Sequence, residues 1–232
     1  MAIYRICGLN VEMTPQYNEL LDRAAPFLSR DSASDISIKL KDADVQALAQ
    51  QAGLSVPLAE YQLSCVEFCS QLLYHGGFVL HASAVLYKDF VYLFSAPSGI
   101  GKSTHAALWV KNIEGAVIIN DDKPAIRIID GVPYAFGTPW CGSGYGRINA
   151  CGVVKALYFL RRAEFNYVKP MDKSKTPYLL LESMLRPADS HGMDALFVSL
   201  QSFLDKVSVL SLDCNMQDEA AFTAFAATED LR

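Results

Sequence analysis

The first 75 residues show short, alternating patterns of hydrophobic and polar positions. The elements expected there are, in order, a strand over 3–12, a short amphipathic segment over 16–30, an edge strand over 35–40, and helices over 45–54 and 57–75. The last helix has the clearest pattern, because Pro57 stands near its start, apolar residues recur three and four positions apart, and Gly76-Gly77 ends it. This part is therefore expected to be a small strand-and-helix region.

From residue 76 onward the pattern changes to apolar, strand-like runs. The expected strands are 78–86, 90–95, 116–120, 125–129, 132–136, 153–160 and 207–212, and the expected helices are 103–112, 176–185, 193–205 and 215–227. Lys88-Asp89 and Asp130-Gly131 are expected to form turns, the second as a two-residue hairpin. The sequence predicts a mixed, strand-rich α/β (α+β) fold, with residues 1–75 packed as a small region on a larger domain of residues 76–232.

Composition narrows the classes of function. The chain has 232 residues, 51% hydrophobic and 19% charged, as in a globular protein with a sizeable core. Its net charge of −5 gives no support for a nucleic-acid or anionic-membrane partner, since both need clustered lysine and arginine. No uncharged apolar run is long enough for a membrane span, and the start of the chain lacks the shape of a signal peptide.

The six cysteines show neither CxxC spacing nor the spacing of a zinc site. Cys65 and Cys69 lie four residues apart in an expected helix and share one face, which favours a buried apolar pair over a metal site. Free cysteines are typical of the reducing cytosol, so we expect a cytoplasmic protein.

Residues 96–103 read APSGIGKS, the pattern of a phosphate-binding (Walker A) loop with Ala96 in place of the first glycine. An apolar strand precedes this loop and a helix follows it, so backbone N–H groups would converge on an anion. Lys102 would add a charge for the β- and γ-phosphates, and Ser103 a hydroxyl for Mg²⁺. The residues expected to bind the nucleotide are Ala96, Ser98, Gly99, Ile100, Gly101, Lys102, Ser103 and Thr104. The alternative is a chance match on a glycine turn.

Two adjacent carboxylates, Asp121 and Asp122, follow the apolar strand over 116–120. One could act as a general base toward an attacking hydroxyl, and the other could anchor the metal. The alternative is an Asx-type turn leading into Pro124. His81, on the strand before the loop strand, could reach the phosphate end, although a histidine on an apolar strand is commonly a core residue. His105 is expected on the surface of the helix that follows the loop.

The glycine-rich segment 137–146 is long enough to be a functional loop, because ordering such a segment costs conformational entropy. Trp140 could wall a pocket there, and Arg147 could stabilise charge on a transferring phosphoryl group. The alternative is a packed surface loop in which Trp140 plugs the core and Cys141 is a small filler.

Together, His81, the run SAPSGIGKST, the run INDD, the run GTPWCG and the strand VVKALYFL resemble the HPr kinase/phosphorylase family. More narrowly, they resemble the smaller HPr-kinase-like proteins of bacterial peptide-modification gene clusters. The resemblance covers residues 78–165 well and the remainder more loosely. It implies a P-loop core of the HPr kinase C-terminal domain type, which is similar in fold to phosphoenolpyruvate carboxykinase.

The resemblance also implies roles for individual residues. Asp121 would act as the base toward a substrate serine, Asp122 and Ser103 would hold Mg²⁺, and His81 would lie beside the phosphate. Relatives commonly carry a lysine where this chain has Ser143, so that cation is either missing here or supplied by Arg147. No match to the C-terminal signature used for phosphorolysis is found. Hexamers occur in the resembled family, which allows a homo-oligomer.

The leading hypothesis is an ATP- and Mg²⁺-dependent phosphotransferase that moves the γ-phosphate to a serine hydroxyl of a peptide or protein. Its catalytic residues would be Asp121, His81 and Arg147. One alternative is a nucleotide-binding regulatory or interaction module without transfer activity. The other is a carboxykinase-like lyase, which would need an arginine cluster; the candidates Arg127, Arg147, Arg161 and Arg162 form no evident cluster in the sequence.

Overall fold

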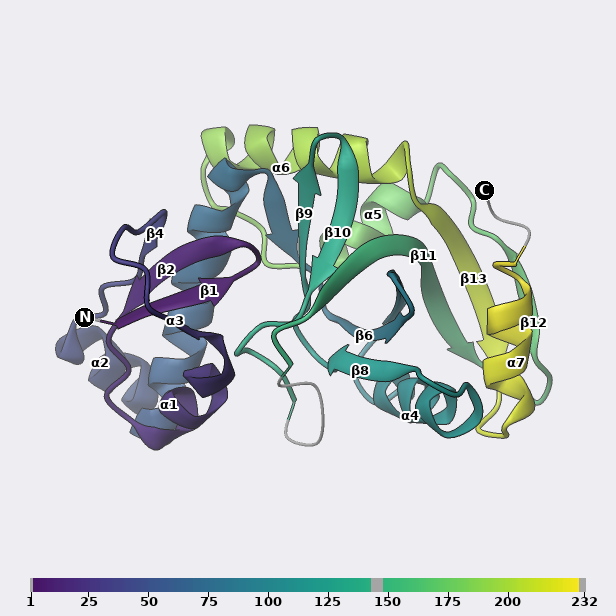
Figure 1. The fold of residues 1–232 in the computed structure, drawn as a ribbon, viewed down its shortest axis with the longest axis horizontal. Coiled ribbons are helices and arrows are strands. Elements are labelled where there is room, and N and C mark those ends of the chain that lie inside the picture. Colours follow the sequence, from purple (N-terminus) through teal and green to yellow (C-terminus); the bar gives the residue numbers. More distant parts are fainter. Residues whose placement is uncertain (1, 143–147, 230–232) are drawn as a thin grey trace.

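The computed structural model describes residues 2–142 and 148–229 and shows a mixed α/β protein with two sheets. Figure 1 shows the N-terminal strands and helices at one side of the molecule and a large, curled, strand-rich sheet over the rest. The mixed, strand-rich fold class expected from the sequence is therefore present. The division into domains at residue 75 stays a prediction.

The N-terminal region contains a four-stranded sheet in the order β3-β1-β2-β4. Its elements are β1 (Ala2–Ile6), β2 (Leu9–Met13), α1 (Asn18–Ala24), β3 (Leu28–Ser29), β4 (Ile36–Ser37), α2 (Asp42–Ala52) and α3 (Val56–Leu72). The single strand expected over 3–12 is wrong, because the chain reverses at Cys7-Gly8 to make an antiparallel hairpin. Both turn residues have positive φ, 55° and 74°, and a cysteine gives little signal for such a turn.

The second sheet has nine strands, seven of them in the order β5-β9-β10-β11-β7-β6-β8. The strands are β5 (Gly77–Val79), β6 (Ala82–Tyr87), β7 (Phe90–Ser95), β8 (Val117–Asn120), β9 (Ala125–Ile129), β10 (Val132–Phe136), β11 (Cys151–Arg162), β12 (Tyr167–Pro170) and β13 (Ser208–Cys214). The long strand β11 pairs in parallel with β7 and β13 and in antiparallel with β10. Because β11 changes neighbours along its length, the sheet curls around it (Figure 1).

Both expected hairpins are present, and Lys88-Asp89 joins the antiparallel strands β6 and β7 as predicted. Asp130-Gly131 joins β9 to β10 with φ values of 51° and 76°, so that prediction is confirmed. The strand expected over 78–86 is instead divided at Leu80-His81, because β5 pairs with β9 whereas β6 pairs with β7 and β8. At the break, the backbone N–H of His81 donates to Ser183 O at 2.7 Å. The division places His81 at a bend rather than within a strand. The sequence also gave no indication of β12.

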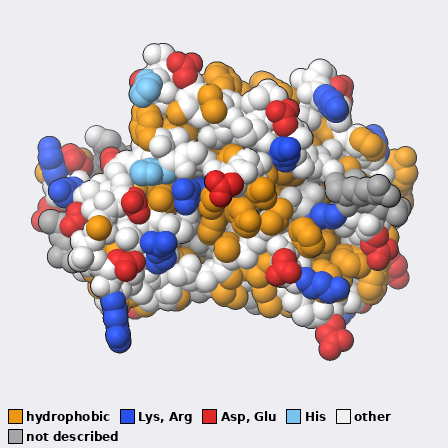
Figure 2. Space-filling view, turned by 45° about the horizontal axis from the view of Figure 1, so that its top comes forward, with side chains coloured by type: hydrophobic (Ala, Val, Ile, Leu, Met, Phe, Trp, Pro, Cys, Tyr) orange, Lys and Arg blue, Asp and Glu red, His pale blue; other side chains and the backbone are white. Residues whose placement is uncertain are grey.

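Helices cover the second sheet on two sides. They are α4 (Lys102–Asn112), α5 (Thr176–Glu182), α6 (Ser190–Leu204) and α7 (Glu219–Ala226). Helices α4 and α7 contact each other and share a core in which Trp109 packs on Phe94, with ring centroids 5.3 Å apart. Helix α6 contacts β5, β9 and β10. On the face shown in Figure 2, hydrophobic side chains gather over the middle.

The N-terminal region packs directly on the second sheet through Trp140. This side chain is fully buried, stacks on Phe68 of α3 at 4.6 Å between ring centroids, and donates from Nε1 to Ser64 Oγ at 3.0 Å. Cys65 and Cys69 are buried with their sulfur atoms 4.0 Å apart, as expected of an apolar pair. Among the residues described, no helix combines the length and apolarity needed to cross a bilayer.

His105 lies in the core and not on the helix surface as expected. Its side chain is 2% exposed, and Nε2 accepts a hydrogen bond from Trp109 Nε1 at 3.1 Å, while Nδ1 has no hydrogen-bond partner among the residues described. Burial penalises the charged imidazolium and lowers the pKa of His105 to about 4.

We therefore expect His105 to make the protein less stable in mild acid. Between its ordinary pKa of 6.5 and about 4, the unfolded chain binds a proton at this histidine and the folded chain does not. The free energy of unfolding should fall as the pH falls through this window, by up to about 3 kcal/mol, and level off below it. Urea denaturation across the window should show a smaller pH dependence in His105→Gln than in the wild type. The matched control is His191→Gln, at an exposed histidine; an unchanged pH dependence in His105→Gln would contradict the assignment.

Candidate functional site

Most of the residues singled out in the sequence meet in one cleft at the end of β7, with a volume of about 400 Å³. The loop contributes Ser98, Gly99, Gly101, Lys102, Ser103 and Thr104 to its lining. His81, Asp121, Asp122 and Gly142 also line it, as does Arg162, which bonds to the loop itself. The cleft therefore joins a cationic loop to a pair of carboxylates.

The loop has the expected order of elements, because β7 ends at Ser95 and α4 begins at Lys102. Gly99 and Gly101 have φ values of 80° and 125°, which residues with a Cβ adopt only under strain. The first turn of α4 lines the cleft, so its N–H groups, which have no partner within the helix, stand at this end of the cleft. Of the other residues expected to bind a nucleotide, Ala96 and Ile100 do not line the cleft; Ile100 packs on the core beneath α4.

Lys102 is held inside the loop. Its side chain is 7% exposed, and Nζ donates to Ala96 O at 3.0 Å. Burial lowers the pKa of Lys102, and the nearby negative charge of Asp122 partly opposes that shift. The ammonium group is thus kept close to the backbone turn around which an anion would bind.

The two carboxylates differ in their surroundings. Asp121 is 8% exposed, and its Oδ1 accepts a hydrogen bond from the Gly142 N–H at 2.6 Å. Asp122 is more exposed; it pairs with Lys123, and its Oδ1 lies 3.4 Å from His81 Nε2. One aspartate is therefore oriented by the backbone, whereas the other lies between Lys123 and His81.

Asn120 was not singled out from the sequence. Its side chain forms the turn over residues 120–123, which contains both aspartates. Its Oδ1 accepts from the backbone N–H groups of Asp122 and Lys123, at 2.9 and 2.7 Å. Its Nδ2 donates to Thr138 Oγ1 at 3.0 Å. The Asx-type turn considered as an alternative does exist, but the Asn120 side chain makes it, and both aspartates still line the cleft.

His81 stands at the bend between β5 and β6 with 42% of its side chain exposed. Burial is the main cause that lowers the pKa of His81, and the charge of Lys102 adds to it, while Asp122 acts in the opposite direction. Because the ordinary value is already 6.5, the imidazole is neutral at neutral pH. It can then act as a hydrogen-bonding group without adding a positive charge.

The segment 137–142 is fixed from the N-terminal region. Cys141 O accepts hydrogen bonds from Arg23 at 2.7 Å and from Tyr61 Oη at 2.9 Å. Arg23 also donates to Gly142 O at 3.2 Å, lies over the Tyr61 ring and pairs with Glu19 at 2.6 Å. These contacts aim the Gly142 N–H at Asp121. No local pattern marks Arg23 or Tyr61, because their partners lie 118 and 80 residues away in the sequence.

A cation is expected near a transferred phosphate. The sequence predicted Arg147 for this place, and the structure offers a second candidate, Arg162. Arg147 and Ser143 both lie outside the described residues, so those two expectations stay predictions. Arg162 lines the cleft instead, donating from Nε to Ile100 O at 3.1 Å and bonding Gly99 O. A signal was available: β11 ends in two arginines and runs parallel to β7, so their carboxyl ends meet at one edge of the sheet.

The donors in the cleft suit a magnesium ion that arrives with phosphates. Ser103 and Asp122 offer oxygen ligands, and Mg²⁺ commonly takes one or two carboxylates together with substrate phosphates and waters. Among the described residues, no group of three or more His, Cys, Asp or Glu could hold a metal. The residues therefore fit a phosphate-bound ion and not a cage of protein ligands.

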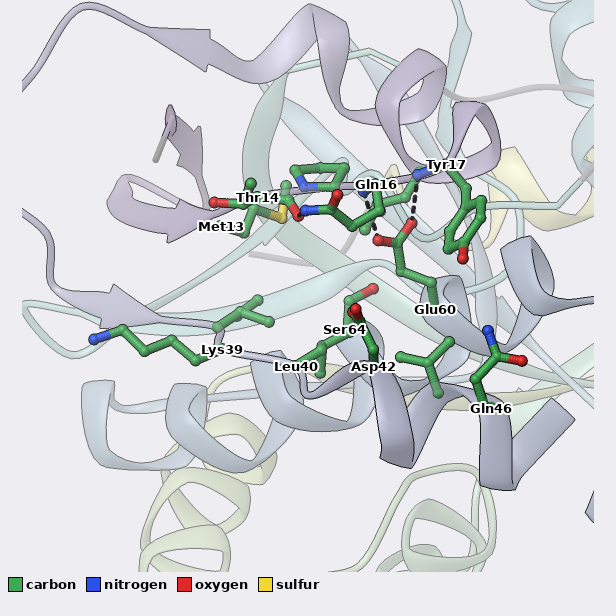
Figure 3. A pocket seen from close by; sticks show the side chains of 14 residues that line it. Met13, Thr14, Gln16, Tyr17, Lys39, Leu40, Asp42, Gln46, Glu60 and Ser64 are labelled. Atoms are coloured by element: carbon green, nitrogen blue, oxygen red, sulfur yellow. Dashed lines mark hydrogen bonds between the residues drawn. The ribbon is translucent and has the colours of Figure 1, made fainter.

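A separate cavity of about 200 Å³ lies within the N-terminal region (Figure 3). Glu60, at 3% exposure, accepts hydrogen bonds there from the backbone N–H groups of Gln16 and Tyr17, at 2.6 and 3.1 Å. Burial raises the pKa of Glu60. This cavity shares no residue with the cleft, and Glu60 braces the turn that leads into α1.

Among solved structures, the chain is similar to the Hpr(Ser) kinase/phosphatase from Coxiella burnetii. The two share 12% sequence identity with a TM-score of 0.37, and the match covers 64% of this chain and 95% of that chain. A likeness of this size does not establish a shared activity. No protein-family model and no curated protein sequence matches the chain.

We expect Arg23→Met to loosen the segment that orients Asp121. The change removes charged hydrogen bonds to two backbone carbonyls, so the free energy of unfolding should fall by about 2 kcal/mol. The Gly142 amide should exchange its hydrogen about tenfold faster or more, as measured by NMR. Arg5→Met, at a half-exposed arginine of β1, is the control. Unchanged Gly142 exchange in Arg23→Met would show that the segment holds its position without Arg23.

Proposed function

We propose that the cleft binds ATP with Mg²⁺ and that the protein transfers the terminal phosphate to a serine hydroxyl of a peptide or protein. One observation carries this proposal. A loop whose backbone N–H groups and buried lysine suit an anion lines the same cleft as two carboxylates. The proposal includes a core of the HPr kinase C-terminal domain or carboxykinase type.

The loop is suited to a triphosphate. Lys102 Nζ now donates to Ala96 O, and a phosphate oxygen is a stronger partner for an ammonium group than a neutral carbonyl. The N–H groups in the first turn of α4 add positive potential at the same end of the cleft. Arg162, at the carboxyl end of β11, stands beside Gly99 and would place a second cation near the phosphates.

Ser103 and Asp122 would hold the magnesium ion, which when bound neutralises charge on the phosphate oxygens. Asp122 already lies close to Lys123 and His81. The Asp122 carboxylate therefore has a role separate from that of Asp121, the group that would receive the proton.

Asp121 would accept that proton. In the transfer, the serine oxygen forms a bond to the γ-phosphorus, and the bond from that phosphorus to the bridging oxygen breaks. ADP leaves with the bonding electron pair, and the serine proton passes to Asp121. The Gly142 N–H bond to Oδ1 fixes the direction of this carboxylate. His81 would contact the phosphate as a neutral hydrogen-bonding group, and Arg147 stays a proposed cation of the same reaction.

The lyase alternative gains no support from the described arginines. Arg162 lines the cleft, but Arg161 pairs with Asp213 at 2.6 Å and Arg127 donates to Cys7 O at 2.7 Å. A site for a dicarboxylate needs several cations that converge, and these side chains point to different partners.

We expect two substitutions to separate nucleotide binding from transfer. Lys102→Met should weaken MgATP binding about tenfold or more, because a buried charge-assisted contact is lost. Asp121→Asn should bind MgATP normally but transfer phosphate about 10² to 10⁴ times more slowly. Calorimetry measures the binding, and mass spectrometry of serine peptides measures the transfer. MgATP binding by the wild type with no transfer to any serine peptide would instead support a nucleotide-binding module.

Gly142→Ala tests the orientation of Asp121. A Cβ at this position would lie 2.7 Å from both carboxylate oxygens, so Asp121 would have to move. Transfer should fall about tenfold or more, with MgATP affinity unchanged. Asn149→Ala, at an exposed residue further along the same connection, should leave both unchanged. A Gly142→Ala protein with full transfer activity would rule out a need for this orientation.

A further inference from the structure

A third cavity adjoins the cleft on the far side of His81. Its volume is about 250 Å³, and its lining comes from α3, from β5 and the bend at His81, and from the end of α5 and the segment after it. Two charged residues, Lys123 and Glu182, also line it. Cys65, Cys69 and Val79 are each at least nine-tenths buried. Met184 and Leu185 also line the cavity, and Leu185 is 51% exposed. The cavity is thus mainly apolar and has an exposed leucine at its edge.

His81 belongs to the lining of both spaces, so it forms the partition between them. The opposite wall of the apolar cavity, at Ser183, is hydrogen-bonded to His81 and to the end of β7. Ser183 O accepts from the His81 N–H at 2.7 Å, and Ser183 Oγ accepts from Ser95 Oγ at 3.2 Å. Ser95 is the last residue of β7 before the loop. The position of the cavity relative to the cleft is therefore fixed by hydrogen bonds to the strand that carries the loop.

The lining decides what can enter. An aliphatic side chain would remove apolar surface from water against Val79, Met184 and Leu185. An anionic side chain would lose hydration beside the two buried thiols and would meet the like charge of Glu182, since Lys123 already pairs with Asp122. Adjacent residues of an extended peptide have Cα atoms about 3.8 Å apart, so a hydroxyl in the cleft brings its neighbours to the partition.

We propose that this cavity receives an aliphatic side chain of the acceptor, from a residue next to the serine that is phosphorylated. The inference rests on the proposed function and adds a side-chain preference to it: a serine with an adjacent leucine, isoleucine or methionine. Because the cavity and the cleft share His81, we assign the side chain that enters the cavity to the peptide whose serine lies in the cleft.

The methionines allow the two sites to be observed separately. Six are present in the chain; Met184 lines the apolar cavity and Met216 lines the cleft. In protein labelled with ¹³C at the methionine methyl groups, MgATP should shift the Met216 signal. The peptide Ac-Leu-Ser-Leu-NH₂ should shift the Met184 signal, whereas Ac-Ala-Ser-Ala-NH₂ should bind at least about tenfold more weakly.

Leu185→Asp should abolish the leucine preference, and because Leu185 is half exposed the variant should fold. Leu28→Asp is the matched control, at a leucine of β3 that is 63% exposed and lines none of these cavities. In transfer assays, the leucine peptide should be preferred about tenfold by wild type and by Leu28→Asp, but not by Leu185→Asp.

Equal responses of Met184 to the leucine and alanine peptides, or no response to either, would overturn the proposal. So would a Met184 response without any preference in transfer, since the cavity would then bind something other than the acceptor. A Met216 signal that does not shift when MgATP is added would count against the proposed function itself. This outcome is distinct from the others because Met216 lines the cleft and Met184 lines the apolar cavity.

Discussion

The hydrogen bond from the Gly142 N–H to Asp121 is the contact on which the geometry of the cleft depends. Arg23 and Tyr61 of the N-terminal region hold the Cys141 carbonyl just before this N–H, and so couple that region to the strand end that carries both carboxylates. A backbone donor cannot rotate away as a side chain can, so it fixes the direction of Asp121. The N-terminal region is in this way part of the site, although none of its residues from 2 to 75 lines the cleft.

The curled sheet explains how residues distant in sequence converge. β7 leads into the loop, β8 ends at the aspartates, and β11 ends at Arg162. β7 and β11 are parallel neighbours, while β6 lies between β7 and β8, so three chain segments reach one edge. His81 reaches the same edge because the chain bends there to change sheet partners. The bend also separates the polar cleft from the apolar cavity, which gives the two spaces different chemistry a few residues apart.

Burial controls the charges in this region. It lowers the pKa of Lys102, of His81 and of His105, though with different consequences. Lys102 keeps a carbonyl partner and remains suited to an anion, whereas neutral His81 can contribute a hydrogen bond without a charge. His105 lies on the buried face of α4, the helix that follows the loop, and accepts a hydrogen bond from Trp109, so its burial serves the core.

Some of this could be predicted from the sequence alone. The strand, loop and helix around Lys102, the turn at Asp130-Gly131 and the position of the aspartates follow from local chemistry: glycine freedom, apolar runs and charged strand ends. The reversal at Cys7, the bend at His81 and the burial of His105 were not predicted from the sequence, because sheet pairing and packing override the local pattern. Only the tertiary structure shows how Arg23 orients Gly142, how Arg162 enters the cleft and how the apolar cavity forms beside it. Those contacts join distant segments, such as Arg23 and Gly142, which are 119 residues apart, and no local spacing encodes which segments will meet.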